Sequence, residues 1–280
     1  MNVTSHVLDF TSNDAEVSIV PIGDVHGGHV NCDEKLLRQT VKRIEEDPNA
    51  YWCGMGDYTE SIWRTDRRHR EDQYAHWLHG EQRVWHLQRE WVIEQLAPIA
   101  DKCLFFLQGN HELHALQKYG VDMYHCIGER LFGADRVKGK LPGIHTFCRV
   151  RLERVSNTGF RSQQTSFIIY AHHGFGGGDL AGSKALKLER LPGRYEADLY
   201  LMGHTHDRQA LSRQVVSCSR RSNKVMTHQS VAAYTGSFLQ TIVEGNQMYA
   251  EEKGYQPLGH GTIEVRVCFN NGNPQTRVVL

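Results

Sequence analysis

The chain has 280 residues, of which 40% are hydrophobic, so it is long enough to bury a substantial core. Its 32 basic residues balance 32 acidic ones, which excludes the strongly basic character of a protein built to bind nucleic acid over its whole surface. No apolar run approaches the roughly 20 residues of a membrane-spanning helix, and the N-terminal MNVTSHVLDF lacks the pattern of a signal peptide. The seven cysteines contain no CxxC pair, so we expect a soluble cytoplasmic protein without a disulfide framework.

Short apolar runs predict strands that are buried on both faces, because the runs are continuous rather than alternating. They cover residues 17–22, 51–55, 103–107, 167–171 and 199–202. Residues 31–46 have the periodicity of a helix, with Asn31 and Glu34 at capping positions. Residues 81–97 have a similar apolar stripe, so the pattern indicates an α/β fold.

The connection over residues 112–165 is long for a simple loop. We expect it to contain a helix near residues 122–131 and a strand near residues 145–154, which together could form a wall of a cleft.

The pattern of the sequence changes after the apolar run at 199–202. Strand-like segments such as residues 262–269 alternate there with Gly and Asn turns. With no repeat and no low-complexity linker, we expect one domain over residues 1–280. It would consist of a motif-bearing α/β part, 1–208, and a mainly β part, 209–280.

A polar cluster follows each apolar run. The clusters are GDVHG at 23–27, GDY at 56–58, GNHE at 109–112, HHG at 172–174 and GHTH at 203–206. Ligand sites of open α/β sheets form beyond the carboxyl ends of the strands, so these segments are expected to meet. Their carboxylate, amide and imidazole groups suit divalent metal ions. One such cluster occurs often by chance, whereas the ordered set indicates a metal site.

The order of these motifs, DxH, GDxx, GNHE, H and GHxH, resembles the calcineurin-like metallophosphoesterase family, in particular its bacterial and phage members. The motifs span residues 24–206. The resemblance implies a four-layer α/β/β/α sandwich with a dimetal site at the C-terminal ends of the strands. It also implies hydrolysis of a phosphate ester by a hydroxide that bridges the two ions.

The resemblance further implies a role for each motif residue. One ion would be bound by Asp24, His26 and His206, and the other by Asn110, His172 and His204. Asp57 would bridge the ions and take part in catalysis, and His111 would contact the phosphate or protonate the leaving oxygen. The family pattern favours His172 over its neighbour His173, which stays open as the alternative ligand and as a substrate contact.

The charges at this site are consistent with a phosphate substrate. The charge of two divalent ions exceeds that of Asp24, Asp57 and a bridging hydroxide, so the site stays positive and attracts an anion. Manganese is the expected ion, and Fe, Zn, Ni and Co stay open because oxygen and imidazole ligands accept all of them.

Two weaker signals lie near the motifs. Residues 63–70, WRTDRRHR, could capture phosphate through Arg64, Arg67, Arg68 or Arg70, or could form a solvated charged turn. Residues 174–184, GFGGGDLAGSK, lack the spacing of a phosphate-binding loop, so we expect a flexible loop.

The motifs indicate the reaction better than the substrate. The second block resembles the GDYVDRG of Ser/Thr protein phosphatases but reads GDYTES, without the arginine. We therefore expect a phosphodiesterase or nuclease acting on a nucleotide or nucleic acid. The alternatives are a small-molecule phosphomonoesterase, a Ser/Thr protein phosphatase and a non-catalytic binding scaffold of the same fold. The complete set of ligand positions argues against the scaffold.

Overall fold

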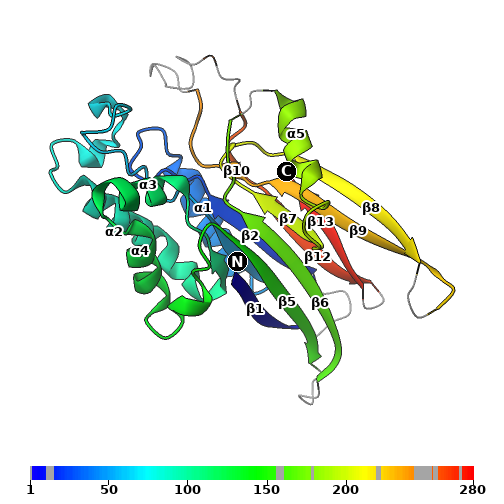
Figure 1. Cartoon of the computed structure of the whole chain (residues 1–280). Coiled ribbons are helices and arrows are strands. Elements are labelled where there is room, and N and C mark those ends of the chain that lie inside the picture. The colour runs from blue at the N-terminus through cyan, green and yellow to red at the C-terminus, as the bar shows by residue number, and fades with distance from the viewer. Residues whose placement is uncertain are drawn as a thin grey trace.

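The computed structural model describes residues 2–10, 16–155, 161–177, 180–218, 222–242, 254, 258–270 and 273–280. Two β-sheets pack face to face, and helices cover the outer face of each sheet (Figure 1). The predicted four-layer α/β/β/α sandwich is confirmed.

The first sheet has five strands in the order β13-β12-β2-β3-β4. Its strands are β2 (Glu16–Gly23), β3 (Ala50–Gly56), β4 (Cys103–Phe106), β12 (Glu264–Asn270) and β13 (Asn273–Val279). The first three run parallel, and β12 pairs antiparallel with both β2 and β13. The carboxyl ends of β2, β3 and β4 therefore lie at one edge of the sheet.

The second sheet has six strands in the order β1-β5-β6-β7-β9-β8. Its strands are β1 (Asn2–Phe10), β5 (His145–Val155), β6 (Arg161–His172), β7 (Leu199–Met202), β8 (Ala210–Cys218) and β9 (Val225–Tyr234). A short pair, β10 (Gly236–Ser237) and β11 (Gly261–Thr262), lies apart from both sheets in the hydrogen-bond pattern. Strand β1 was not predicted. Its segment carries polar residues on both faces, and its pairing partner is the distant β5.

The helices are α1 (Glu34–Glu46), α2 (Val84–Leu96), α3 (Asn110–Tyr119), α4 (Met123–Phe132) and α5 (Ala181–Arg190). Short 3-10 turns lie in the connections between strands and helices: η1 (Glu71–Gln73) and η2 (His76–Leu78) before α2, η3 (Ala97–Lys102) after α2, and η4 (Val137–Gly139) after α4. The predicted helices at 31–46, 81–97 and 122–131 are present. The cap of α1 is Asp33, not Asn31, because the helix begins at Glu34 and the Asp33 side chain accepts from the Leu36 amide at 2.9 Å.

The main core lies between the sheets, where side chains such as Phe105, Phe167 and Leu201 are fully buried. A second core joins α1, α2 and α4 to the outer face of the five-stranded sheet, and a third joins α5 to the other sheet. Central strands are thus covered on both faces, which explains their continuous apolar runs. None of the helices in the described part of the chain combines the length and apolar character needed to cross a membrane.

Candidate metal centre

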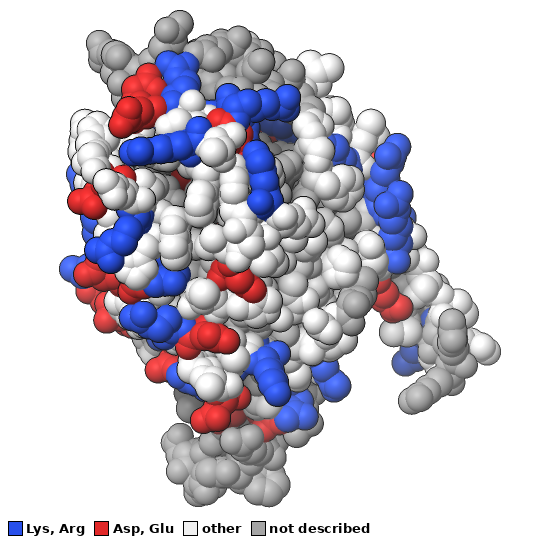
Figure 2. Space-filling model, turned by 60° about the vertical axis from the view of Figure 1, so that its left-hand side comes forward, with Lys and Arg blue, Asp and Glu red and all other residues white. Residues whose placement is uncertain are grey.

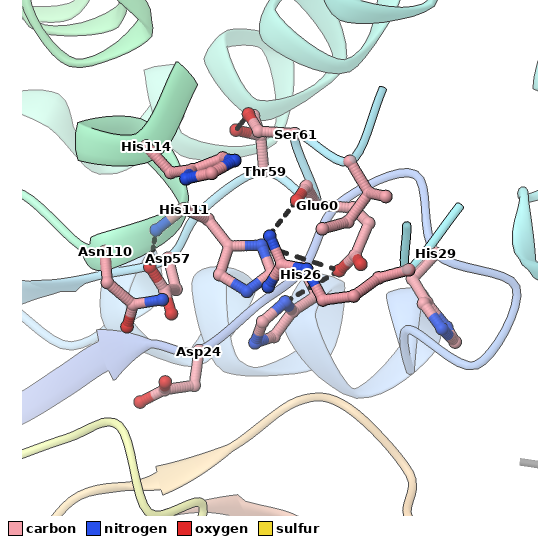
Figure 3. Close-up of polar contacts among 12 residues, drawn as sticks. Asp24, His26, His29, Asp57, Thr59, Glu60, Ser61, Asn110, His111 and His114 are labelled. Atoms are coloured by element: carbon pink, nitrogen blue, oxygen red, sulfur yellow. Dashed lines mark hydrogen bonds and ion pairs between the residues drawn. The ribbon is translucent and has the colours of Figure 1, made fainter. Parts of the chain in front are cut away.

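The polar clusters predicted from the sequence meet at the edge where the parallel strands of both sheets end. The loops after β2 and β3 are joined by backbone bonds, because Val25 and His26 donate to the carbonyl of Asp57 at 2.9 and 3.0 Å. The two sheets are joined at the same place, where the His204 amide donates to Asp24 Oδ2 at 2.9 Å. Figure 3 shows Asp24, His26, Asp57, Asn110 and His111 around this point.

The first group of donor atoms comes from Asp24, His26 and His206, which lie within 4.8 Å of one another. The Nε2 atoms of the two histidines are 3.2 Å apart, and His206 Nε2 is 3.4 Å from Asp24 Oδ1. Asp24 Oδ1 is buried and accepts no hydrogen bond from any residue that the structure describes. Two ring nitrogens that face each other beside an unpaired carboxylate oxygen fit a divalent cation.

The second group comes from Asp57, His173 and His204, again with donor atoms within 4.8 Å. Asn110 completes it, since its Oδ1 lies 2.8 Å from His173 Nε2 and 2.6 Å from His204 Nδ1. Burial alone would raise the pKa of the Asp57 carboxyl, but the neighbouring His173 and His111 hold it well below its usual value. This direction favours the ionised carboxylate, which is the form that binds a metal ion.

The structure brings His173, and not the favoured His172, into this group. His173 is only 1% exposed. Its Nδ1 donates a hydrogen bond to the Met55 carbonyl at 2.7 Å, so the lone pair that can bind a metal ion is on Nε2. His172 Nδ1 instead accepts from the Gly174 amide at 2.8 Å, and its ring contacts His145. Neighbouring residues at a strand end point to opposite faces, so only one of the pair can reach the site.

His111 lies in the first turn of α3, next to both groups. Its amide donates to Asp57 Oδ1 at 2.8 Å, and its Nδ1 donates to the carbonyl of Glu60. Its ring meets that of His26 edge to face with centroids 4.6 Å apart. Burial alone would lower the pKa of His111, but the charges of Asp57 and Glu60 raise it, so the ring is disposed to carry a proton.

Two glutamates were missed by the sequence analysis. Glu60 Oε2 lies 2.8 Å from His26 Nδ1. Glu112 is fully buried and accepts from the backbone amides of Asp57, Tyr58, Thr59 and Gly109 at 2.8–3.1 Å. Glu112 is the last letter of GNHE, and Glu60 follows GDY two residues later, so an acidic residue within three residues of a predicted ligand was the available signal.

The ligand loops adopt strained backbone conformations. Asp24, His26, Asp57, His204 and His206 all have positive φ angles, between 47° and 69°. This left-handed region costs a residue other than glycine about 1 kcal/mol or more, and such residues cluster at functional sites. Backbone hydrogen bonds between the loops, and the hydrogen bonds that Glu112 accepts, stabilise these conformations. The donor atoms are thus arranged in advance.

The predicted arginines lie in a segment that packs against α3. Trp63 stacks on Tyr119 with ring centroids 4.6 Å apart, and Asp66 lies 3.2 Å from His114. Arg68 pairs with Asp66 at 3.1 Å, and Arg70 pairs with Asp72 at 2.9 Å. Arg64 and Arg67 are exposed. Trp63 and Asp66 thus place this segment beside the helix that begins with Asn110 and His111, and none of its arginines belongs to the two ligand groups of the described residues.

The glycine-rich segment 174–184 lies partly outside the described residues. In its described part, Lys187 of α5 donates to the carbonyl of Gly177 at 2.8 Å, and residues from Ala181 onward belong to α5.

Residues 17–208 match the family model of the calcineurin-like phosphoesterases. Because this match covers more than half of the chain, the protein belongs to the calcineurin-like phosphoesterase family. It is a metal-dependent phosphoesterase, so its substrate is a phosphate ester.

Similar solved structures include a conserved predicted phosphoesterase from Streptococcus pneumoniae. It is 11% identical, with 95% of this chain and 99% of that chain covered and a TM-score of 0.33. A metallophosphoesterase from Sphaerobacter thermophilus is 12% identical, with 94% of this chain and 89% of that chain covered and a TM-score of 0.36. A comparison with curated proteins gives no match.

Proposed function

We propose that this phosphoesterase binds two divalent ions, preferably Mn²⁺, and hydrolyses a phosphodiester of a nucleotide or nucleic acid. The main support is the adjacency of two donor groups. The first consists of Asp24, His26 and His206, and the second of Asn110, His173 and His204. Asp57 is proposed to bridge them, since it lies in the second group while its carbonyl is bonded to the His26 amide of the first.

The residues around the ions have distinct proposed roles. Bound divalent ions supply positive charge for the phosphoryl oxygens and lower the pKa of coordinated water. Asp57, held ionised, balances part of that charge. His111 Nδ1 is committed to the Glu60 carbonyl, so Nε2 is the atom that can give a proton to the leaving oxygen. The raised pKa of His111 favours the protonated form that this step needs.

The arginines of the segment that packs against α3 support a diester of a nucleotide or nucleic acid as the substrate. Figure 2 shows one face of the molecule, on which Lys and Arg side chains are numerous in the upper part beside a few acidic ones, whereas basic and acidic side chains are mixed lower down. Exposed Arg64 and Arg67 can contribute to phosphate binding. A small-molecule phosphomonoesterase is the second candidate, because the donor groups alone suit a monoester equally well.

The deciding experiment compares the hydrolysis of bis-p-nitrophenyl phosphate, p-nitrophenyl phosphate, single-stranded DNA and cyclic nucleotides by Mn²⁺-loaded protein. We expect a higher kcat/KM for the diesters than for the monoester. In His111→Ala, kcat should fall by about 100-fold or more while the metal content is unchanged. A preference for the monoester would favour the second candidate. Inactivity on every ester with Mn²⁺, Fe²⁺, Zn²⁺ and Ni²⁺ would favour the non-catalytic scaffold.

A further inference from the structure

Glu60 lies between two histidines of the site, on the loop that follows β3. Its Oε2 is 2.8 Å from His26 Nδ1 and 4.0 Å from His111 Nδ1, and its side chain is only 13% exposed. Figure 3 shows its carboxylate directed at the edge of the His26 ring that faces away from Asp24. The carboxylate therefore approaches His26 from the side opposite the donor atoms.

This contact determines which nitrogen of His26 carries the proton. An ionised carboxylate only accepts hydrogen bonds, so Nδ1 must be the protonated nitrogen. The lone pair is then on Nε2, which faces His206 Nε2 at 3.2 Å and belongs to the first donor group. Without Glu60, both tautomers of a neutral His26 become accessible, and only one of them can bind an ion through Nε2.

The second donor group contains Asp57, but among the described residues no carboxylate lies behind its His173 as Glu60 lies behind His26. Its His173 is oriented in the same way, but by the neutral carbonyl of Met55 at 2.7 Å. Each group contains one aspartate, Asp24 or Asp57, and the first group has the additional carboxylate of Glu60 behind its histidine, whereas Asn110 of the second group is uncharged. A carboxylate behind a histidine also makes the ligand nitrogen more basic, and such partners typically change metal affinity by about 10–100-fold.

We propose that Glu60 is a positioning residue that holds His26 in its metal-binding tautomer and makes the Asp24–His26–His206 group the tighter of the two metal sites. This inference rests on the proposed binding of two ions. Glu60 contacts His111 mainly through its own backbone carbonyl. Substituting the Glu60 side chain therefore leaves that bond in place. The substitution also removes a charge that acts on His111, so its effect on His26 is measured by metal binding and by the tautomer of His26, not by activity.

The test measures Mn²⁺ binding to metal-free, full-length protein by calorimetry. The wild type should bind two ions with unequal Kd. In Glu60→Gln the tighter Kd should rise about 10-fold, and in Glu60→Ala up to about 100-fold, with the weaker Kd unchanged. Glu81→Gln, at an exposed glutamate of the same connection, is the matched control and should bind like the wild type. In His173→Ala, which keeps only the first group, adding Glu60→Gln should weaken the one remaining site.

A second measurement works without metal. The ¹⁵N shifts of His26 in the metal-free wild type should show protonated Nδ1 and free Nε2, and in Glu60→Ala a mixture of tautomers. An unchanged tighter Kd, an unchanged tautomer, or loss of both sites with a lower unfolding temperature of the metal-free variant would overturn the inference. If the wild type bound fewer than two ions, the proposed function would fail instead, and the tautomer measurement would still decide the role of Glu60.

Discussion

At the scale of single residues, the contrast between His172 and His173 shows how one position along a strand end changes chemistry. His173 is buried with Nε2 beside Asn110, while His172 lies on the other face beside His145. Both residues are histidines, and they are adjacent in the sequence. Their different roles follow from the alternation of side chains at the end of β6.

Alanine variants of His173 and His172 form a matched pair. His173→Ala should remove one bound ion per chain and lower kcat/KM by at least about 100-fold, because it deletes a ligand. His172→Ala should keep both ions, as measured by elemental analysis after gel filtration. Loss of an ion in His172→Ala, with full loading in His173→Ala, would restore the ligand choice made from the family pattern.

The exposed arginines allow a second test at this scale. Arg64→Ala and Arg67→Ala should raise KM for single-stranded DNA a few-fold and reduce its dependence on salt, because each loses one phosphate contact. Hydrolysis of p-nitrophenyl phosphate should not change. Arg149→Ala, at an exposed arginine of β5, serves as control. If KM for DNA were the same in all three variants, the segment 63–70 would be a solvated charged turn.

At the scale of elements, Glu112 connects α3 to the loop that carries Asp57. Each of its carboxylate oxygens accepts two backbone amides, Oε1 those of Tyr58 and Thr59, and Oε2 those of Asp57 and Gly109. This buried carboxylate satisfies amides that the strained loop would otherwise leave unpaired. The conformation of Asp57 therefore depends on the first turn of α3.

Replacing Glu112 tests this connection. In Glu112→Gln the new amide group faces backbone N–H donors and cannot accept from them. The free energy of unfolding should fall by about 2–4 kcal/mol, measured by urea titration of the metal-free protein. Glu129→Gln, on the exposed face of α4, should change it by less than about 0.5 kcal/mol. A similarly small change in Glu112→Gln would show that the loop holds its shape without the carboxylate.

At the scale of the whole molecule, the site draws on both sheets. Asp24, Asp57 and Asn110 follow strands of the five-stranded sheet, whereas His173 and His204 follow strands of the six-stranded sheet. The C-terminal strands also divide, since β8 and β9 join one sheet and β12 and β13 the other. Bound ions would therefore link the two halves of the sandwich, and we expect the chain to unfold as a single domain.

Metal removal tests this expectation. Calorimetric scans should show one transition, and saturating Mn²⁺ at about 100 times its Kd should stabilise the fold by about 2.7 kcal/mol per site. A chelator should reverse the shift, and Asp57→Asn should abolish most of it. Two separate transitions, or an unfolding temperature that does not respond to Mn²⁺, would contradict a single domain held together at its metal centre.

Much of the fold was predictable because it depends on local patterns. The apolar runs at 17–22 and 51–55 became β2 and β3, and the periodic segment 31–46 became α1. Strand β1 was not predictable in this way, since its polar segment is a strand by virtue of pairing Asn2–Phe10 with the distant β5. Pairing between segments far apart in the chain leaves little signal in either of them.

The sequence by itself determined the reaction class, because the order of the Asp, Asn and His clusters after buried strands is a property of the chain alone and identifies the family. Only the tertiary structure decided that His173 rather than His172 faces Asn110, and that Glu60 lies behind His26. The physical reason is that each of these contacts joins different strand-end loops. The contact of His173 with Asn110 depends on how the two sheets pack, and the contact of His26 with Glu60 on how β2 and β3 pair within one sheet, not on the spacing of residues within any one motif.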